Sequence, residues 1–362
     1  MNYRKPFLVA LAILMILQPA LPQSKVGTTA APFLGIAVGA RALGMGGAFV
    51  AVANDATSLY WNPAGMARLS SYEVILVHTD WISDLSFDFV GAVFPLKGAG
   101  ALGVQITMLS MGEMEVTNET HQDGTGIFFD ASDLAVGVSY ALSMTDRFSI
   151  GFTGKYIQQK IWHESAEGVA LDLGTLYTTP LHMNIIEFVA SLMCIDVGTL
   201  FTVPHDGMRI GMAISNFGTD MQMRGRDMLV LYDPSAIKEG NNSEILAELR
   251  TEKWPLPLNL RVGVATDLLA KPNHILTAVV SAQHPNDNTE SVNLGAEYWY
   301  QKMLALRAGY KSLFLKDSEE GLTMGIGLVP PLRAGFGLHL DFAYENFNRL
   351  GSIYKYSLSV TF

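Results

Sequence analysis

Catalysis would need a nucleophile beside a base, or side chains spaced to hold a metal ion. The chain has eight histidines and one cysteine, and none of them lies in a recognisable nucleophile motif. His163-Glu164, and His121 with Asp123, lack the ligand spacing that recurs in zinc sites. The sequence therefore predicts no catalytic residue, no metal site and no enzymatic activity.

Two other patterns have residue types that occur in ligand sites. The oxygen-rich run Pro285-Asn286-Asp287-Asn288 has calcium-binding side chains, but an exposed polar turn explains it better. Gly44, Gly46 and Gly47 do not follow the strand of a βαβ unit, so they predict no dinucleotide site. We expect no cofactor, and the formal net charge of −10 argues against nucleic acid as a partner.

Charged and polar side chains recur on one face of the segments that read as strands. A polar interior is normal for a transmembrane β-barrel, so these residues are predicted to face a lumen. Two interpretations stay open, namely contacts with a plug and with one another, or a ligand or gate function. The predicted lumen-facing residues are Lys155, Arg209, Arg261, Glu297, Arg307, His339, Asp341 and Lys355.

The elements that must position these side chains are strands, because apolar residues alternate with small or polar ones from residue 70 onward. Successive side chains of a strand point to opposite faces. Most segments approach the roughly 9–11 residues that a tilted strand needs to cross a bilayer. We predict fourteen strands, near 72–80, 84–96, 100–110, 131–141, 146–160, 168–179, 208–217, 257–268, 273–283, 290–300, 303–311, 321–328, 335–345 and 352–362.

Loop lengths give an independent signal for a membrane barrel. The connections after even-numbered strands are mostly tight, whereas residues 111–130, 218–256 and 312–320 form long polar connections after odd-numbered strands. Outer-membrane barrels have short periplasmic turns and long external loops. The chain also ends on an amphipathic strand with Phe362 at its terminus, which resembles the assembly signal of bacterial outer-membrane barrels.

One connection departs from this rule. Residues 180–207 follow an even-numbered strand, yet they are long and partly apolar. They are interpreted as a periplasmic insertion, which keeps fourteen strands, or as an extra hairpin, which would make sixteen. We favour fourteen.

The N-terminus is predicted to direct export. Arg4 and Lys5 precede a short apolar run, and small residues follow near Ala20, which is a signal-peptide layout. We place the signal peptide at residues 1–24. Beyond it, residues 25–69 read as an N-terminal plug, or hatch, and residues 70–362 as the transmembrane barrel.

The predicted plug is rich in glycine and in large apolar residues. Gly44, Gly46 and Gly47 let backbone approach backbone closely, whereas the apolar side chains need burial. Asn62-Pro63-Ala64 is a turn signal just before the first strand. The segment is therefore interpreted as an irregular structure inside the barrel.

Several runs of this sequence resemble a known family. The run GARALGMGGAFVAVANDATSLYWNPAGMA, residues 39–67, is similar to the N-terminal signature of the PorV/PorQ outer-membrane proteins. These in turn resemble the FadL-type long-chain fatty acid transporters, which share the Asn-Pro-Ala triplet in their plug. The similarity continues at residues 129–137, 146–151, 155–157, 214–218 and 254–257.

The resemblance implies an all-β, fourteen-stranded antiparallel barrel in the bacterial outer membrane, closed by an N-terminal hatch. PorV-like relatives partner the type IX secretion machinery and receive secreted cargo, whereas FadL-like relatives transport hydrophobic small molecules such as long-chain fatty acids. Both functions stay open here, as does a purely structural outer-membrane protein without transport. The implied partners are outer-membrane lipid with secreted cargo or secretion subunits, or else a hydrophobic ligand.

Overall fold

The computed structural model describes residues 27–179, 208–232, 245–315, 318–332 and 335–362. Fourteen strands form one closed antiparallel ring, and a fifteenth, β10 (Arg224–Gly225), pairs with the first residues of β8. The ring strands are β1 (Glu73–Asp80), β2 (Ser86–Leu96), β3 (Gly100–Ser110), β6 (Ala131–Ser143), β7 (Phe148–Ile161), β8 (Glu164–Thr178), β9 (Arg209–Gly218), β13 (Asn259–Lys271), β14 (His274–Pro285), β15 (Ser291–Tyr300), β16 (Leu304–Leu313), β17 (Leu322–Leu328), β18 (Gly337–Asn346) and β19 (Ser352–Thr361).

Two pairings close the ring. The first and last strands pair from Glu73↔Thr361 to Asp80↔Tyr354, and β8 pairs directly with β9. Closure leaves no open sheet edge, which a bilayer could not hydrogen-bond. Because β8 and β9 are neighbours, the ring has no place for the extra hairpin considered for residues 180–207, which themselves lie outside the described residues. The predicted fourteen-stranded barrel is thus confirmed.

The strand positions agree closely with those predicted from alternation. The largest boundary difference is at β8, which was predicted from residue 168 and begins at Glu164. Outward side chains are apolar and exposed, such as Val138 at 60% and Leu171 at 61%. The inward set is largely small or polar and buried, including Thr153 and Ser139. Such an outer surface suits lipid rather than water.

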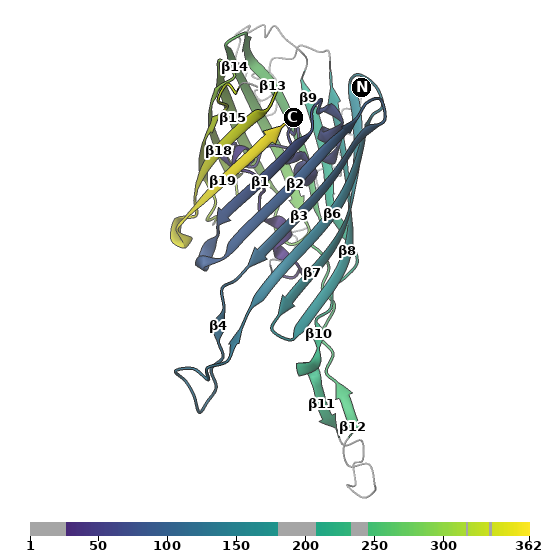
Figure 1. Cartoon of the computed structure of the whole chain (residues 1–362), viewed down its shortest axis with the longest axis vertical. Helices are drawn as coiled ribbons and strands as arrows, with labels where there is room; N and C mark the ends of the chain where they lie inside the picture. Colours follow the sequence, from purple (N-terminus) through teal and green to yellow (C-terminus); the bar gives the residue numbers. More distant parts are fainter. Residues whose placement is uncertain (1–26, 180–207, 233–244, 316–317, 333–334) are drawn as a thin grey trace, which may run out of the picture.

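The long connections β3–β6 and β9–β13 lie at the same end of the barrel, as the loop lengths predicted (Figure 1). The connection between β3 and β6 carries the short pair β4 (Met114–Glu115) and β5 (Phe128–Phe129). The connection between β9 and β13 carries a projecting hairpin, β11 (Leu229–Tyr232) with β12 (Ile245–Glu248). We call this the loop end and the opposite one the turn end. The connection between β7 and β8 is also at the loop end, although it is a tight turn.

Residues 27–72 form the N-terminal segment, which contains no long helix. Its elements are η1 (Pro32–Gly35), α2 (Ala40–Gly44), α3 (Ser58–Trp61) and η2 (Pro63–Arg68). Figure 1 shows these short purple helices within the ring of strands. Nearly every residue from Val38 to Ala53 is buried, because the segment contacts inward faces of strands around the ring.

The segment runs the length of the barrel. At the loop end, the Ala30 amide donates to Pro255 O at 2.9 Å, and Thr29 Oγ1 donates to Asp287 at 2.9 Å. At the turn end, Arg68 donates to Thr178 Oγ1 at 2.6 Å, and the Tyr72 amide donates to Phe362 O at 3.1 Å. The chain therefore enters β1 only after crossing the barrel interior.

Candidate functional site

The Asn62-Pro63-Ala64 turn joins the N-terminal segment to the barrel wall. Asn62 is fully buried and caps η2, because its Oδ1 accepts from the Ala64 amide at 3.2 Å. Its Nδ2 donates to Val50 O and to Thr175 O of β8, each at 2.9 Å. The Asn62 side chain thus connects the turn to an earlier part of the segment and to the barrel wall.

Replacing Asn62 with leucine is expected to lower the free energy of unfolding by about 1–3 kcal/mol. Leucine fills a similar volume, but it leaves buried polar backbone groups without their partner. The urea midpoint of the protein in lipid vesicles measures this. Asn118→Leu, at an exposed position of the β3–β6 connection, is the matched control and should leave the midpoint unchanged. Equal midpoints for the two variants would contradict the assigned role of Asn62.

Two glycines of the segment, Gly44 and Gly46, are positions of close approach to the wall. A Cβ on Gly44 would lie 2.9 Å from the Cα of Gly325 in β17. Gly46 and Gly47 have φ values of +65° and +70°, a backbone conformation that residues other than glycine rarely adopt. A Cβ on Gly46 would also lie 2.9 Å from the Tyr310 amide nitrogen. Larger residues would therefore push the segment off the wall.

A chain of ion pairs connects the segment to β15, β16 and β18. Arg41 of α2 makes two 2.8 Å hydrogen bonds to Glu297 and one of 2.9 Å to Asp55. Glu297 also accepts from Arg307 Nε at 2.8 Å, and Arg307 donates to Asp341 at 2.6 Å. Five buried or part-buried charges therefore alternate in sign, so each cation has a carboxylate partner.

This chain opens onto a cavity of about 360 Å³ near the turn end. Arg41, Asp55, Arg307 and Asp341 line it, together with His339. Three residues of the predicted lumen-facing set, Arg307, His339 and Asp341, therefore lie together at this cavity. A fourth, Glu297, forms an ion pair with Arg307.

The other predicted lumen-facing residues are inward but lie apart. Lys155 pairs with Asp172 at 2.9 Å, and Arg209 pairs with Asp267 at 2.6 Å. Lys355 donates to Ala37 O of the segment. Arg261 contacts Tyr60 and Trp61 instead of a carboxylate. Whether any of these residues binds a ligand stays a prediction.

Sequence reasoning missed Arg41, which joins the two halves of the ion-pair chain. A signal was present, because Arg41 is the only charged residue between Leu34 and Asn54. A lone charge in an apolar run must find a buried partner or return to water. Its partners could not be named from sequence, because Glu297 is 256 residues away.

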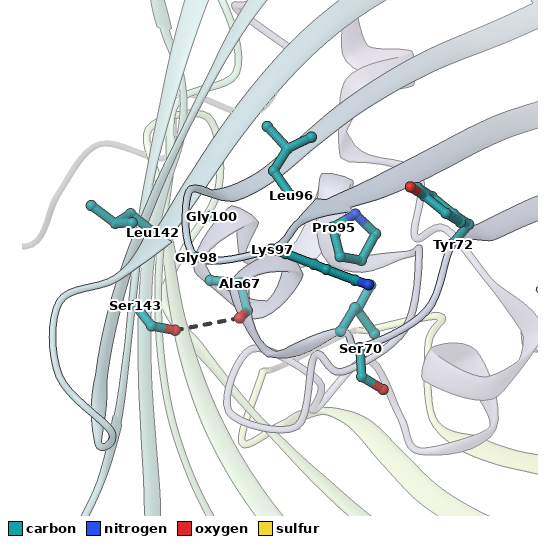
Figure 2. Close-up of a pocket in the computed structure, with 11 residues that line it drawn as sticks. Ala67, Ser70, Tyr72, Pro95, Leu96, Lys97, Gly98, Gly100, Leu142 and Ser143 are labelled. Carbon is teal, nitrogen blue, oxygen red and sulfur yellow. Dashed lines mark hydrogen bonds between the residues drawn. The ribbon is translucent and has the colours of Figure 1, made fainter.

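A second hollow lies where the segment leaves the barrel (Figure 2). It measures about 610 Å³ and lies between the end of the segment and the β2–β3 and β6–β7 turns. Ser143 Oγ donates to Ala67 O across it at 3.3 Å. Lys97 is the only charged side chain among the residues that line this hollow. The lining therefore indicates no particular class of ligand.

The sequence matches a known protein family over much of the length of the chain. The family described as type IX secretion system protein PorV matches residues 20–225, more than half of the chain. The chain belongs to the PorV family. The resemblance predicted from residues 39–67 is thereby confirmed. No curated protein matches the chain.

Solved structures show the fold of this PorV-family chain in other proteins. The CymD monoaromatic hydrocarbon channel is 12% identical, with 90% of this chain and 96% of that chain covered and a TM-score of 0.51. The Ralstonia pickettii toluene transporter TbuX is 12% identical, with 90% and 97% covered and a TM-score of 0.50. At this identity the likeness concerns the fold alone.

A Pseudomonas aeruginosa FadL homologue is also similar, at 11% identity, with 88% of this chain and 96% of that chain covered and a TM-score of 0.40. The PorV-family chain thus shares its barrel fold with the CymD channel and the TbuX transporter. Its family and structural neighbours are transport- or secretion-related barrels rather than enzymes. Within the described ranges, no helix is long and apolar enough to span a bilayer, and no cluster of three His, Cys, Asp or Glu residues suits a metal ion.

Proposed function

We propose that this protein is a plugged barrel of the bacterial outer membrane that serves type IX protein secretion. In this proposal it binds secreted cargo or secretion subunits at its loop end and catalyses no reaction. The observation that carries it is the β11–β12 hairpin, which projects beyond the barrel (Figure 1) and exposes apolar side chains.

Both faces of this hairpin are apolar. Leu231 and Leu246 form a cross-strand pair, each 66% exposed. Tyr232 and Ile245 form the next pair, on the opposite face, and both are exposed. An isolated two-stranded hairpin is at best marginally stable in water, and exposed apolar patches commonly mark interaction sites. A protein partner would bury these side chains and stabilise the hairpin.

We further propose that the N-terminal segment is the plug. The predicted division supports the same reading, with residues 25–69 as hatch and 70–362 as barrel. The signal peptide predicted at residues 1–24 lies outside the described residues. In this proposal residues 1–24 direct export, residues 25–69 close the barrel, and residues 70–362 insert into the membrane.

A transporter of hydrophobic molecules was the alternative function. It calls for an apolar pocket near the loop end. Among the described residues, one cavity at that end measures about 170 Å³ and is lined by Arg261, Lys311, Asp287, Glu320 and several amide side chains. A small polar cavity suits a fatty acid poorly, so the secretion role is the better supported one.

Co-purification tests the proposal. Native purification from an organism with type IX secretion should recover a secreted protein or a secretion subunit with the barrel. The double change Leu231→Ser and Leu246→Ser should reduce recovery at least about tenfold, because burying one leucine contributes roughly 1.5–3 kcal/mol.

The matched control is Phe128→Ser on β5, which is also exposed at the loop end but lies outside the hairpin. It should recover partners as the unaltered protein does. Recovery of the barrel alone from cells that produce type IX cargo would overturn the proposed function. Equal recovery with the hairpin variant would move the interface elsewhere.

A further inference from the structure

Arg261 of β13 is a buried cation without an acidic partner. Its exposed fraction is 6%. Its hydrogen bonds are long and go to neutral groups, namely Ser215 Oγ at 3.3 Å and the Tyr60 hydroxyl at 3.3 Å. Its Nε has no protein acceptor among the described residues, and no described carboxylate is within ion-pair distance.

This arrangement differs from that of the other buried arginines. Arg41 and Arg307 each contact two carboxylates at 2.6–2.9 Å. Burying a charge is costly unless that charge is paired. Arg261 is therefore a buried arginine whose positive charge has no carboxylate partner at short range in the described part of the protein.

The N-terminal segment holds the Arg261 guanidinium between aromatic rings. Its central carbon lies 5.1 Å from the ring centre of Tyr60 and 5.1 Å from that of Trp61. Such cation–π contacts fix the plane of the guanidinium without neutralising it. A fixed, planar fork of donors matches a carboxylate in geometry.

Arg261, Tyr60 and Trp61 all line the cavity of about 170 Å³ at the loop end. Two residues of its wall also carry polar atoms that have no hydrogen-bond partner among the described residues, the amide oxygen of Asn259 and the hydroxyl of Thr289. These groups suit a ligand that carries a hydroxyl beside its charged group. The cavity volume limits that ligand to a few heavy atoms.

The cavity also contains acidic groups, which restrict the charge of a ligand. Asp287 accepts a hydrogen bond from Thr29, and Glu320 pairs with Lys311 at 2.6 Å. Two carboxylates on the wall would repel a dianion more strongly than a monoanion. The electrostatics thus favour a single negative charge placed at Arg261.

We propose that this cavity binds a small hydroxycarboxylate monoanion, with its carboxylate on Arg261 and its hydroxyl near Asn259 and Thr289. The site is formed jointly by the barrel wall and the N-terminal segment. A bound anion would therefore stabilise the segment in its place. The proposal does not depend on the secretion role, because it involves neither the hairpin nor a protein partner.

Calorimetric titration of the full-length protein in detergent tests the site. Sodium lactate is the probe, and lactamide, which has the same shape without the charge, is its control. We expect saturable binding of lactate and at least tenfold weaker binding of lactamide. Equal binding of the two, or no binding of lactate at millimolar concentration, would overturn the proposal without any variant being needed.

Variants then locate the site. Arg261→Gln should weaken lactate binding at least tenfold, and Arg261→Lys, which keeps the charge but loses the fork, should weaken it less. Arg209→Gln is the matched control, because Arg209 is also inward but is paired with Asp267 near the turn end, and it should bind as the unaltered protein does. Unchanged binding in both Arg261 variants would assign lactate to another site and refute this one.

Discussion

Deletion of residues 36–66 is expected to convert a closed barrel into an open one that still inserts into membranes. The ring closes through β1–β19 and β8–β9 pairing, and those pairings do not involve the N-terminal segment. The segment fills an interior whose wall is lined by small residues, including Gly151, Gly211 and Gly309 at contact positions. Removing it would take the large side chains of the segment, such as Phe49 and Trp61, out of the lumen.

Planar-bilayer conductance and liposome leakage measure this effect. The unaltered protein should conduct little, whereas the deletion should give stable open-channel currents and release small solutes. Deleting residues 229–248, which removes β11 and β12, is the matched control and should leave conductance low. A deletion variant that inserts with unaltered permeability would refute the assignment of the segment as a plug.

The wall could be predicted residue by residue because its signal is local. In a strand, each side chain alternates between lipid and lumen, so Val136, Val138 and Tyr140 mark the outer face from sequence alone. Closure follows because an open edge cannot persist in lipid. The N-terminal segment has no such period, and its path depends on contacts with strands far along the chain.

For the interior site, alternation predicted the face but not the partner. Glu297 and Arg307 were both assigned to the lumen, and they are directly opposite each other in the β15–β16 register. Arg209 was assigned in the same way but lies with Asp267 instead. Which inward charges meet depends on strand tilt and on the route of the segment, neither of which a pattern of period two encodes.

Replacing Arg41 with methionine is expected to destabilise the segment in its place by about 3–5 kcal/mol, the cost of breaking a buried ion pair by removing one partner. Methionine keeps much of the side-chain volume but leaves Asp55 without its cation. Glu297 keeps its ion pair with Arg307, so the loss of stabilising free energy should be near the lower limit of this range. The segment, rather than the whole ring, should respond, because Arg41 contributes nothing to strand pairing.

Amide hydrogen exchange separates these two responses. Amides between residues 40 and 61 should exchange roughly 100-fold faster in the variant, because a local loss of about 3 kcal/mol raises the open population by that factor. Amides of β6 and β7, which pair with each other through thirteen residue positions, should exchange as before. Uniform acceleration of the ring and the segment would instead show that the barrel needs the segment to stay folded.

Arg349→Met is the matched control for the Arg41 variant. Arg349 also pairs with a carboxylate, Glu319, but its side chain is 84% exposed at the loop end. The hydrogen bond from Arg349 lowers the pKa of Glu319, yet exposed ion pairs contribute little to stability, so exchange in the segment should not change. Burial rather than pairing would then explain the effect at Arg41: the largely buried carboxylates of the ion-pair chain recover less by hydration than an exposed carboxylate does when the shared cation is removed.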